Sequence, residues 1–287
     1  MVATPIGNLA DISLRALHVL QLADAIACED TRHTQALLRA YGIDKPAGQW
    51  LAVHQHNESQ GAQAVIERLR QGQRVAYASD AGTPAVSDPG ARLAAAVREA
   101  GLRVVPLPGA SSVTAVLSVA GAVSEDGTFL FAGFLPAKAG ERQAAVARLA
   151  QETRATVLLE APHRIEALAR SLATLESRPV TVGRELTKQF EEIATVACSA
   201  LPDWLAADPQ RVRGEFALVL HAAAQAPQGD QGLRVLELLL AELPVKSAVK
   251  LAAEITGAAR NELYQAALAM KARHPGVPRA ASDEGKS

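Results

Sequence analysis

The chain has 287 residues, a formal net charge of −1, 49% hydrophobic residues and 21% charged residues, which is an ordinary soluble composition for two domains, or two plus a small third. This charge gives no support for a nucleic-acid partner, although it does not exclude a local basic groove. Cys28 and Cys198 lack the spacing of a zinc site or a disulfide framework, which favours a cytoplasmic protein. No apolar run approaches the ~18 residues needed to span a membrane, and no signal peptide is visible.

Strand, loop and helix patterns alternate through the first 120 residues or so. Strands are expected at residues 25–27, 75–78 and 104–107, and helices near 14–20, 60–71, 91–100 and 112–120. This alternation predicts a doubly wound α/β domain over residues 1–122. Because Met1-Val2-Ala3 is too short for a strand, we expect the first strand to be truncated by a few residues.

A polar, glycine-punctuated segment at residues 121–127 is a candidate hinge before a second α/β domain, residues 128–222. The strands expected in this domain lie at residues 128–135, 156–160, 180–185, 192–198 and 215–221. Together with a charged helix near residues 138–151, they predict a mixed sheet. Residues 222–232 have the composition of a linker.

The last part of the chain, residues 233–273, predicts three helices with a tight turn at Gly257. Helix, glycine turn and helix are typical of a helix-turn-helix module. Six basic residues against four acidic ones give this segment a charge of only +2, so a nucleic-acid reader and a plain packing module are equally supported. Residues 274–287 are expected to be a disordered tail.

The strongest functional signature is the stretch from Val75 to Gly90. An apolar strand, V-A-Y-A, passes into S-D-A-G-T-P-A-V-S-D-P-G, which places the carboxylate of Asp80 in a small-residue loop at the end of the strand. Open α/β sheets bind ligands at such strand ends, and Gly82 would let a backbone approach a ligand closely. A plain tight turn is the alternative.

The sequence lacks the motifs of several common classes of enzyme. The sequence has no G-x-G-x-x-G dinucleotide fingerprint, no P-loop, no H-E-x-x-H or other metal pattern, and no G-x-S-x-G nucleophile elbow. The remaining loops suit a neutral or zwitterionic small ligand, held largely by main-chain groups and by Asp80.

Eight short motifs occur along the chain, and their combination in this order identifies a family far more specifically than any single motif does. They are T-P-I-G-N-L-A-D-I-S-L-R-A (4–16), E-D-T-R-H-T (29–34), H-x-H-N-E (54–58), S-D-A-G-T-P-A-V-S-D-P-G (79–90), V-P-L-P-G-A-S-S (105–112), G-F-L-P (133–136), E-A-P-H-R (160–164) and R-E-L-T-K (184–188). Together they resemble the bacterial 16S ribosomal RNA cytidine 2′-O-methyltransferase I family of the tetrapyrrole methylase superfamily. The resemblance covers residues 1–222 and the helical C-terminal part.

This resemblance implies a homodimer that binds S-adenosylmethionine (SAM) between two α/β domains. It also implies methylation of cytidine 1402 in the decoding centre of the small ribosomal subunit. The cofactor-binding residues that it implies are Pro5, Ser79, Asp80, Ala81, Gly82, Thr83, Val86, Pro108, Gly109, Ala110, Ser111, Ser112, Glu160 and Glu215.

Methyl transfer to a ribose hydroxyl would gain from a general base or an orienting group. Candidates are Glu29, Asp30 and His33, with Glu160 as a further carboxylate. The two acids before the helix could equally be capping residues, and the histidine a surface residue.

Four cations follow the ends of predicted strands, where they could contact RNA phosphates. They are Arg32, Arg164, Arg184 and Lys188. Their alternative is solvated surface charge or ion pairs with neighbouring carboxylates.

Two other functions compete with RNA methylation. A methylase of a small tetrapyrrole would share the fold, but it would need neither the appended helices nor the E-D-T-R-H-T segment. A ligand-sensing regulator with DNA-binding helices is disfavoured by the mild charge of residues 233–273, because phosphate contacts dominate such binding.

Overall fold

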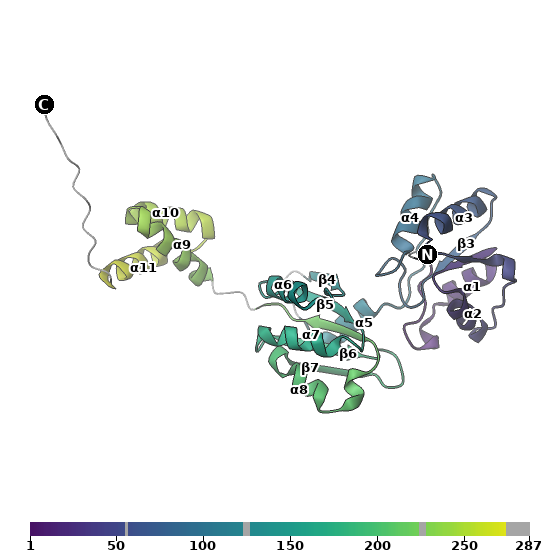
Figure 1. The fold of residues 1–287 in the computed structure, drawn as a ribbon. Helices are drawn as coiled ribbons and strands as arrows, with labels where there is room; N and C mark the ends of the chain where they lie inside the picture. The colour runs from purple at the N-terminus through teal and green to yellow at the C-terminus, as the bar shows by residue number, and fades with distance from the viewer. Residues whose placement is uncertain (55–56, 123–126, 224–227, 274–287) are drawn as a thin grey trace. The chain divides into compact units, whose positions relative to one another are not determined.

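The computed structural model describes residues 1–54, 57–122, 127–223 and 228–273. The chain divides into two compact units, Met1–Ala223 and Ala224–Ser287, and the ribbon is shown in Figure 1. Most of the candidate hinge and the expected tail lie outside the described residues. Within those residues, no helix combines the length and apolar character that crossing a bilayer requires.

The N-terminal half of the first unit is built on a parallel sheet with the strand order β2-β1-β3. The strands are β1 (Ala25–Cys28), β2 (Trp50–Ala52) and β3 (Val75–Ala78). Every residue of β1 is buried, as expected for a central parallel strand that is covered on both faces. The predicted α/β architecture is therefore confirmed.

Two pairs of helices cover the two faces of this sheet. They are α1 (Leu14–Leu22) and α2 (Thr31–Ala40) on one face, and α3 (Glu58–Arg70) and α4 (Gly90–Glu99) on the other. Side chains alternate along a strand, so Ile26 packs with α1 and α2 while its neighbour Ala27 packs with α3 and α4.

The prediction of a strand at residues 104–107 was wrong apart from its last residue. Val2 forms parallel bridges to both Ala78 and Leu107, so the chain start lies between β3 and this segment. Residues 1–3 form hydrogen bonds with Val105 and Leu107, but residues 104–106 belong to no strand. A cavity of about 620 Å³ lies beside them, lined mainly by apolar side chains and by no carboxylate.

The C-terminal half of the first unit is a five-stranded mixed sheet, which confirms the prediction. Its strands are β4 (Phe129–Gly133), β5 (Ala155–Glu160), β6 (Pro179–Arg184), β7 (Glu192–Ala197) and β8 (Phe216–Leu220). The order is β4-β5-β8-β6-β7, and β8 lies antiparallel to both of its neighbours. All five residues of β8 are buried, which makes this strand the centre of the sheet.

Helices cover both faces of the second sheet. One face packs against α6 (Ala139–Leu149), α7 (Ile165–Leu172) and α8 (Leu201–Ala206). The other face packs against α5 (Ser112–Ala120), whose Val116 belongs to the same cluster as Val157 and Val219. Helix α5 therefore joins the loop at residues 108–111 to the second sheet. Short 3-10 helices lie at Leu9–Asp11, Ala47–Gln49, Ala173–Leu175, Cys198–Ala200 and Pro209–Val212.

The second unit holds three helices, as predicted. They are α9 (Gln228–Glu242), α10 (Val245–Thr256) and α11 (Arg260–Arg273). Gly257 ends α10 with a left-handed φ of 71° and makes the expected turn. The linker prediction was wrong for residues 228–232, which are helical. Gly232 is buried, and a side chain there would crowd Ala258 and Leu263, so this glycine permits close helix packing.

We expect Leu218→Ala to lower the free energy of unfolding by about 2–5 kcal/mol, because it removes a fully buried side chain from the central strand and leaves a cavity. Urea denaturation checks this. Ile193→Ala, at a side chain of β7 that is 40% exposed, is the matched control and should cost much less. Equal losses for both variants would contradict the assignment of the core.

Candidate functional site

A cavity of about 430 Å³ lies in the first unit between the loops of the N-terminal sheet and strand ends of the second sheet. From the N-terminal half it is lined by Ile6, Ala81, Gly82, Thr83, Val86, Ser87, Ser111 and Ser112. From the C-terminal half it is lined by Phe134, Leu159, Glu160, Ala161, Pro162, Gly183, Leu186, Lys188, Glu215, Phe216 and Ala217. Its size and its mainly apolar walls with a few polar groups are typical of small-molecule sites.

Hydrogen bonds fix the loop after β3 against its neighbours. The backbones of Thr4 and Gly82 exchange two hydrogen bonds, of 3.0 and 3.1 Å. The Ser79 hydroxyl donates to the carbonyl of Gly82 at 2.6 Å, and the Thr83 hydroxyl donates to the carbonyl of Ala110 at 3.0 Å. The three loops that the sequence singled out in the N-terminal half are therefore held together.

Backbone strain is concentrated beside the cavity. In the described part of the chain, five residues other than glycine have a positive φ. Four of them flank cavity-lining residues: Ala85 and Ser87 on either side of Val86, and Glu185 and Thr187 on either side of Leu186. Such conformations cost about 1–3 kcal/mol each and cluster at functional sites, which supports this cavity as the site.

Glu160 places a buried carboxylate in the cavity wall. Its side chain is 1% exposed, and its Oε1 accepts a hydrogen bond of 3.0 Å from the backbone of Ala161. Arg164 Nε lies 3.0 Å from the same oxygen, an ion pair by proximity without a hydrogen bond between them. Oε2 is buried and has no hydrogen-bond partner in the protein. A buried acceptor without a partner is costly, so a donor group on a ligand fits here.

Lys188 ties two further carboxylates to the cavity. Its Nζ donates to Glu185 Oε1 at 2.8 Å and to Glu215 Oε2 at 2.9 Å. Burial lowers the pKa of Lys188, but these two partners outweigh it and raise the pKa, which keeps the ammonium charged. Gly7 is required nearby, because a side chain at that position would collide with Lys188.

The first turn of α5 offers backbone donors to the cavity. Ser111 is its N-cap, and the serine side chain makes no capping hydrogen bond. Because Ser111 and Ser112 both line the cavity, the free N–H groups of this helix end could hold a carboxylate group of a ligand.

The structure brings together eight of the fourteen residues expected to bind the cofactor: Ala81, Gly82, Thr83, Val86, Ser111, Ser112, Glu160 and Glu215. The other six, Pro5, Ser79, Asp80, Pro108, Gly109 and Ala110, are not among the lining residues. Ser79 and Ala110 instead hold the loops through the hydrogen bonds described above. Phe134 and Leu186 were missed, although each belongs to a quoted motif, G-F-L-P or R-E-L-T-K, whose apolar letters carried no chemical signal.

The candidate bases lie at the carboxyl end of β1, beside the loop after β3. Asp30 is the N-cap of α2, and its carboxylate accepts from the backbone of Arg32 at 2.8 Å, as the capping alternative proposed. Hydrogen bonds from the backbones of Arg32 and His33 lower the pKa of Asp30. His33 is exposed, and its Nε2 lies 3.1 Å from the carbonyl oxygen of Asp80. Asp80 Oδ1 accepts from the backbone of Asp30 at 3.3 Å, so it faces α2.

Glu29 has a different environment from its neighbour Asp30. It is half-buried, and its pKa is raised by burial first and then by the nearby carboxylates of Asp80 and Asp88. None of the three candidate bases is among the residues that line the cavity. A carboxylate with a raised pKa accepts a proton more readily, which favours Glu29 over Asp30 as a base.

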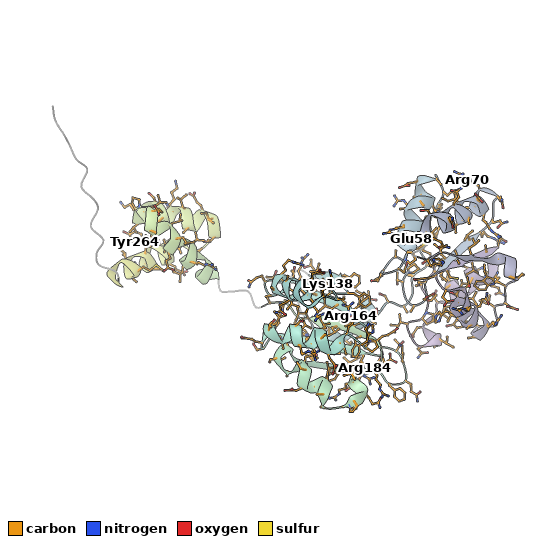
Figure 2. The ribbon with its side chains drawn as sticks, in the orientation of Figure 1. Glu58, Arg70, Lys138, Arg164, Arg184 and Tyr264 are labelled. Atoms are coloured by element: carbon orange, nitrogen blue, oxygen red, sulfur yellow. The ribbon has the colours of Figure 1, made fainter. Side chains whose placement is uncertain are left out.

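The four predicted RNA contacts differ in how free they are. Arg32 is 91% exposed. Arg164 also donates to the carbonyl of Leu135, and Arg184 is buried, with Nη2 donating to the carbonyl of Phe190 at 3.0 Å and an ion pair to Glu192. Figure 2 shows both arginines in the part of the unit that holds the second sheet. Each of the four cations therefore has an ion-pair partner: Arg164, Arg184 and Lys188 are held in theirs, whereas Arg32 lies 3.7 Å from Asp30 Oδ1 in an exposed pair.

The residues that the structure describes contain no group of three or more histidine, cysteine or acidic side chains arranged to hold a metal ion.

Two family matches cover nearly the whole chain. Residues 1–202 match the family described as Tetrapyrrole (Corrin/Porphyrin) Methylases, and residues 226–271 match the RsmI C-terminal HTH domain. The chain is 47% identical over 278 residues to Ribosomal RNA small subunit methyltransferase I of Pseudomonas aeruginosa, covering 93% of this chain and 95% of that protein. It is 47% identical over 275 residues to the protein of the same name in Neisseria meningitidis serogroup A, covering 94% and 93%.

Solved structures share the fold at lower identity. Cobalt precorrin-4 methyltransferase matches with a TM-score of 0.56 and 20% identity, covering 76% of this chain and 92% of that one. Uroporphyrin-III C-methyltransferase from Thermus thermophilus, complexed with S-adenyl homocysteine, matches with a TM-score of 0.50 and 16% identity, covering 76% and 94%. At these identities the likeness concerns the fold alone.

We expect Asp88→Asn to lower the pKa of Glu29 toward its ordinary value, because one of the charges that raise it is removed. A carbon-13 NMR titration of the Glu29 carboxyl checks this. The raised pKa also makes stability depend on pH. Because the folded state holds the Glu29 proton more tightly than the unfolded state does, protonated Glu29 stabilises the fold, and this stabilisation is lost as the pH rises from about 4 through the raised pKa.

Asp44→Asn removes the same charge at a side chain that is 84% exposed, and it should leave the titration of Glu29 unchanged. If Asp88→Asn also leaves it unchanged, the carboxylates do not tune Glu29.

Proposed function

Because the chain belongs to the ribosomal RNA small subunit methyltransferase I family, within the tetrapyrrole methylases, we propose that it methylates 16S ribosomal RNA with SAM as the donor. The observation that carries this proposal is identity of 47% along almost the full length of relatives with that name. The finer proposal is transfer to the ribose 2′-oxygen of cytidine 1402, which rests on the eight ordered motifs.

The cavity residues fit SAM. The serines at the start of α5 could hold its carboxylate, and Glu160 Oε2 could accept from one of its donor groups. Apolar side chains such as Ile6, Leu159 and Leu186 offer a dry wall for its ring and chain. A structural neighbour with this fold is a complex with S-adenyl homocysteine, which supports SAM as the donor.

Bound SAM supplies an electrophilic methyl group on a positively charged sulfur. The acceptor oxygen gains this methyl group as the sulfur–carbon bond breaks and its electron pair stays on sulfur, so the hydroxyl proton must leave. We assign that proton to Glu29, which directly follows β1 beside the loop after β3 and whose surroundings raise its pKa. Asp30 holds the start of α2, and His33 ties that helix to the loop of Asp80. Alignment of the two substrates supplies the rest of the acceleration.

RNA contact is proposed first for Arg32, because its guanidinium is exposed. Arg164 is half-buried and occupied by Glu160, and Arg184 and Lys188 are held in ion pairs, so their RNA contact is the weaker part of the proposal. The C-terminal helical unit is a second proposed contact, since it matches a helix-turn-helix family.

We also propose a homodimer in the cytoplasm, where ribosomal subunits are found. Exposed Phe129 and Phe131 on the edge strand β4 are available for covering by a second copy.

Two alternative functions make different predictions for the experiment described below. A tetrapyrrole methylase is favoured by structural neighbours that act on such compounds, but these are at most 20% identical in the two cases compared. A ligand-sensing DNA-binding regulator is consistent with the helix-turn-helix match, but it gives no reason for the identity to methyltransferases across both sheets.

The deciding experiment offers radiolabelled SAM with three acceptors side by side: small subunits that lack the modification, naked 16S RNA and a precorrin mixture. We expect label in RNA at one cytidine that resists alkaline cleavage, because a 2′-O-methyl group blocks that cleavage. Label in the precorrins alone, or SAM binding without any transfer, would overturn the RNA function.

We expect Glu29→Gln to lower kcat for RNA methylation by about 10²–10⁴-fold and to leave the Kd for SAM unchanged. Single-turnover transfer and calorimetry measure the two quantities. Glu99→Gln, at an exposed position of α4, is the control and should keep full activity. A kcat of Glu29→Gln within a few-fold of the parent would remove Glu29 as the base.

A further inference from the structure

The charges at the cavity are unbalanced. Two carboxylates, Glu160 and Glu215, and one cation, Lys188, line the cavity, which leaves a net charge of −1. Their further ion-pair partners, Arg164 and Glu185, add one charge of each sign and leave this balance unchanged. Glu160 contributes most to this imbalance inside the wall, since its side chain is 1% exposed and one of its oxygens has no partner in the protein. A desolvated carboxylate acts on a ligand charge over several ångströms, because little water screens it.

Resting on the SAM site proposed above, we infer that Glu160 makes the cavity select the charged methyl donor over its neutral product. SAM carries a net charge of +1 at neutral pH, from its sulfonium, ammonium and carboxylate. S-adenosylhomocysteine has lost the sulfonium charge and is neutral. A cavity of charge −1 therefore complements the donor and loses that attraction after transfer, which favours release of the product.

The hydrogen bond and the charge of Glu160 predict different outcomes. Every donor group that Oε2 could accept from is shared by SAM and its product, so a purely hydrogen-bonding role weakens both equally when it is lost. Attraction of the carboxylate to the additional positive charge, when it is lost, weakens SAM and sinefungin more than S-adenosylhomocysteine. Glu160→Gln separates the two, because it keeps an acceptor oxygen and the side-chain size while removing the charge.

The test is calorimetric binding of three probes without RNA: SAM, S-adenosylhomocysteine, and sinefungin, which carries an ammonium where SAM has its sulfonium. We expect the full-length protein to bind SAM and sinefungin more tightly than S-adenosylhomocysteine. In Glu160→Gln this preference should fall by about tenfold, the size of a modest charge–charge interaction. Glu166→Gln, which removes the same charge from an exposed position of α7, should keep the preference.

A second variant changes the preference in the opposite direction. Lys188→Gln removes a cation from the cavity, so we expect the preference for SAM over S-adenosylhomocysteine to rise. This variant, and the preference of the unmodified protein, keep the test decisive if Glu160→Gln fails to fold.

Equal weakening of all three probes in Glu160→Gln, or an unmodified protein that binds S-adenosylhomocysteine at least as tightly as SAM, would overturn the inference. Failure of all three probes to bind would overturn the proposed SAM site along with it. The expected preference combined with no transfer to RNA would overturn only the proposed RNA function.

Discussion

The packing of α5 on the second sheet is the contact on which the site depends. The body of the helix buries Val116 in the cluster that holds Val157 and Val219, while its first residues, Ser111 and Ser112, line the cavity. The loop before α5 also holds the loop after β3, through the bond from Thr83 to Ala110. One helix therefore fixes the N-terminal loops against the strand ends of the second sheet, and the cavity is the space left between them.

Strain and charge are placed around that space at some cost to stability. Left-handed backbone at Ala85, Ser87, Glu185 and Thr187, and a carboxylate oxygen without a partner at Glu160, are unfavourable in themselves. The buried clusters on the two faces of the second sheet offset these costs. Rigid loops around a small cavity reduce the ordering that a ligand must bring about when it binds.

Periodicity and punctuation were enough to predict most of the architecture, because strand and helix periods differ and glycine marks ends. They failed where distant contacts decide: residues 104–107 lack a full-length partner, and Gly232 serves packing rather than flexibility. The loops of the site were predictable from small residues at strand ends. The apolar lining residues were not, since Phe134 and Leu186 look like any core residue in sequence. Nor could the sequence show that the side chain of Arg184 is buried and forms an ion pair with Glu192.

The strand order of the second sheet has a consequence for synthesis. Strand β8 is the last strand among the described residues, yet it lies between β5 and β6, which are synthesised before it. These two strands have no direct pairing, so the sheet stays open until residues 216–220 have left the ribosome. Glu215, Phe216 and Ala217 also complete the cavity wall. A nascent chain therefore exposes strand edges late into translation, and ligand binding can begin only after almost the whole first unit exists.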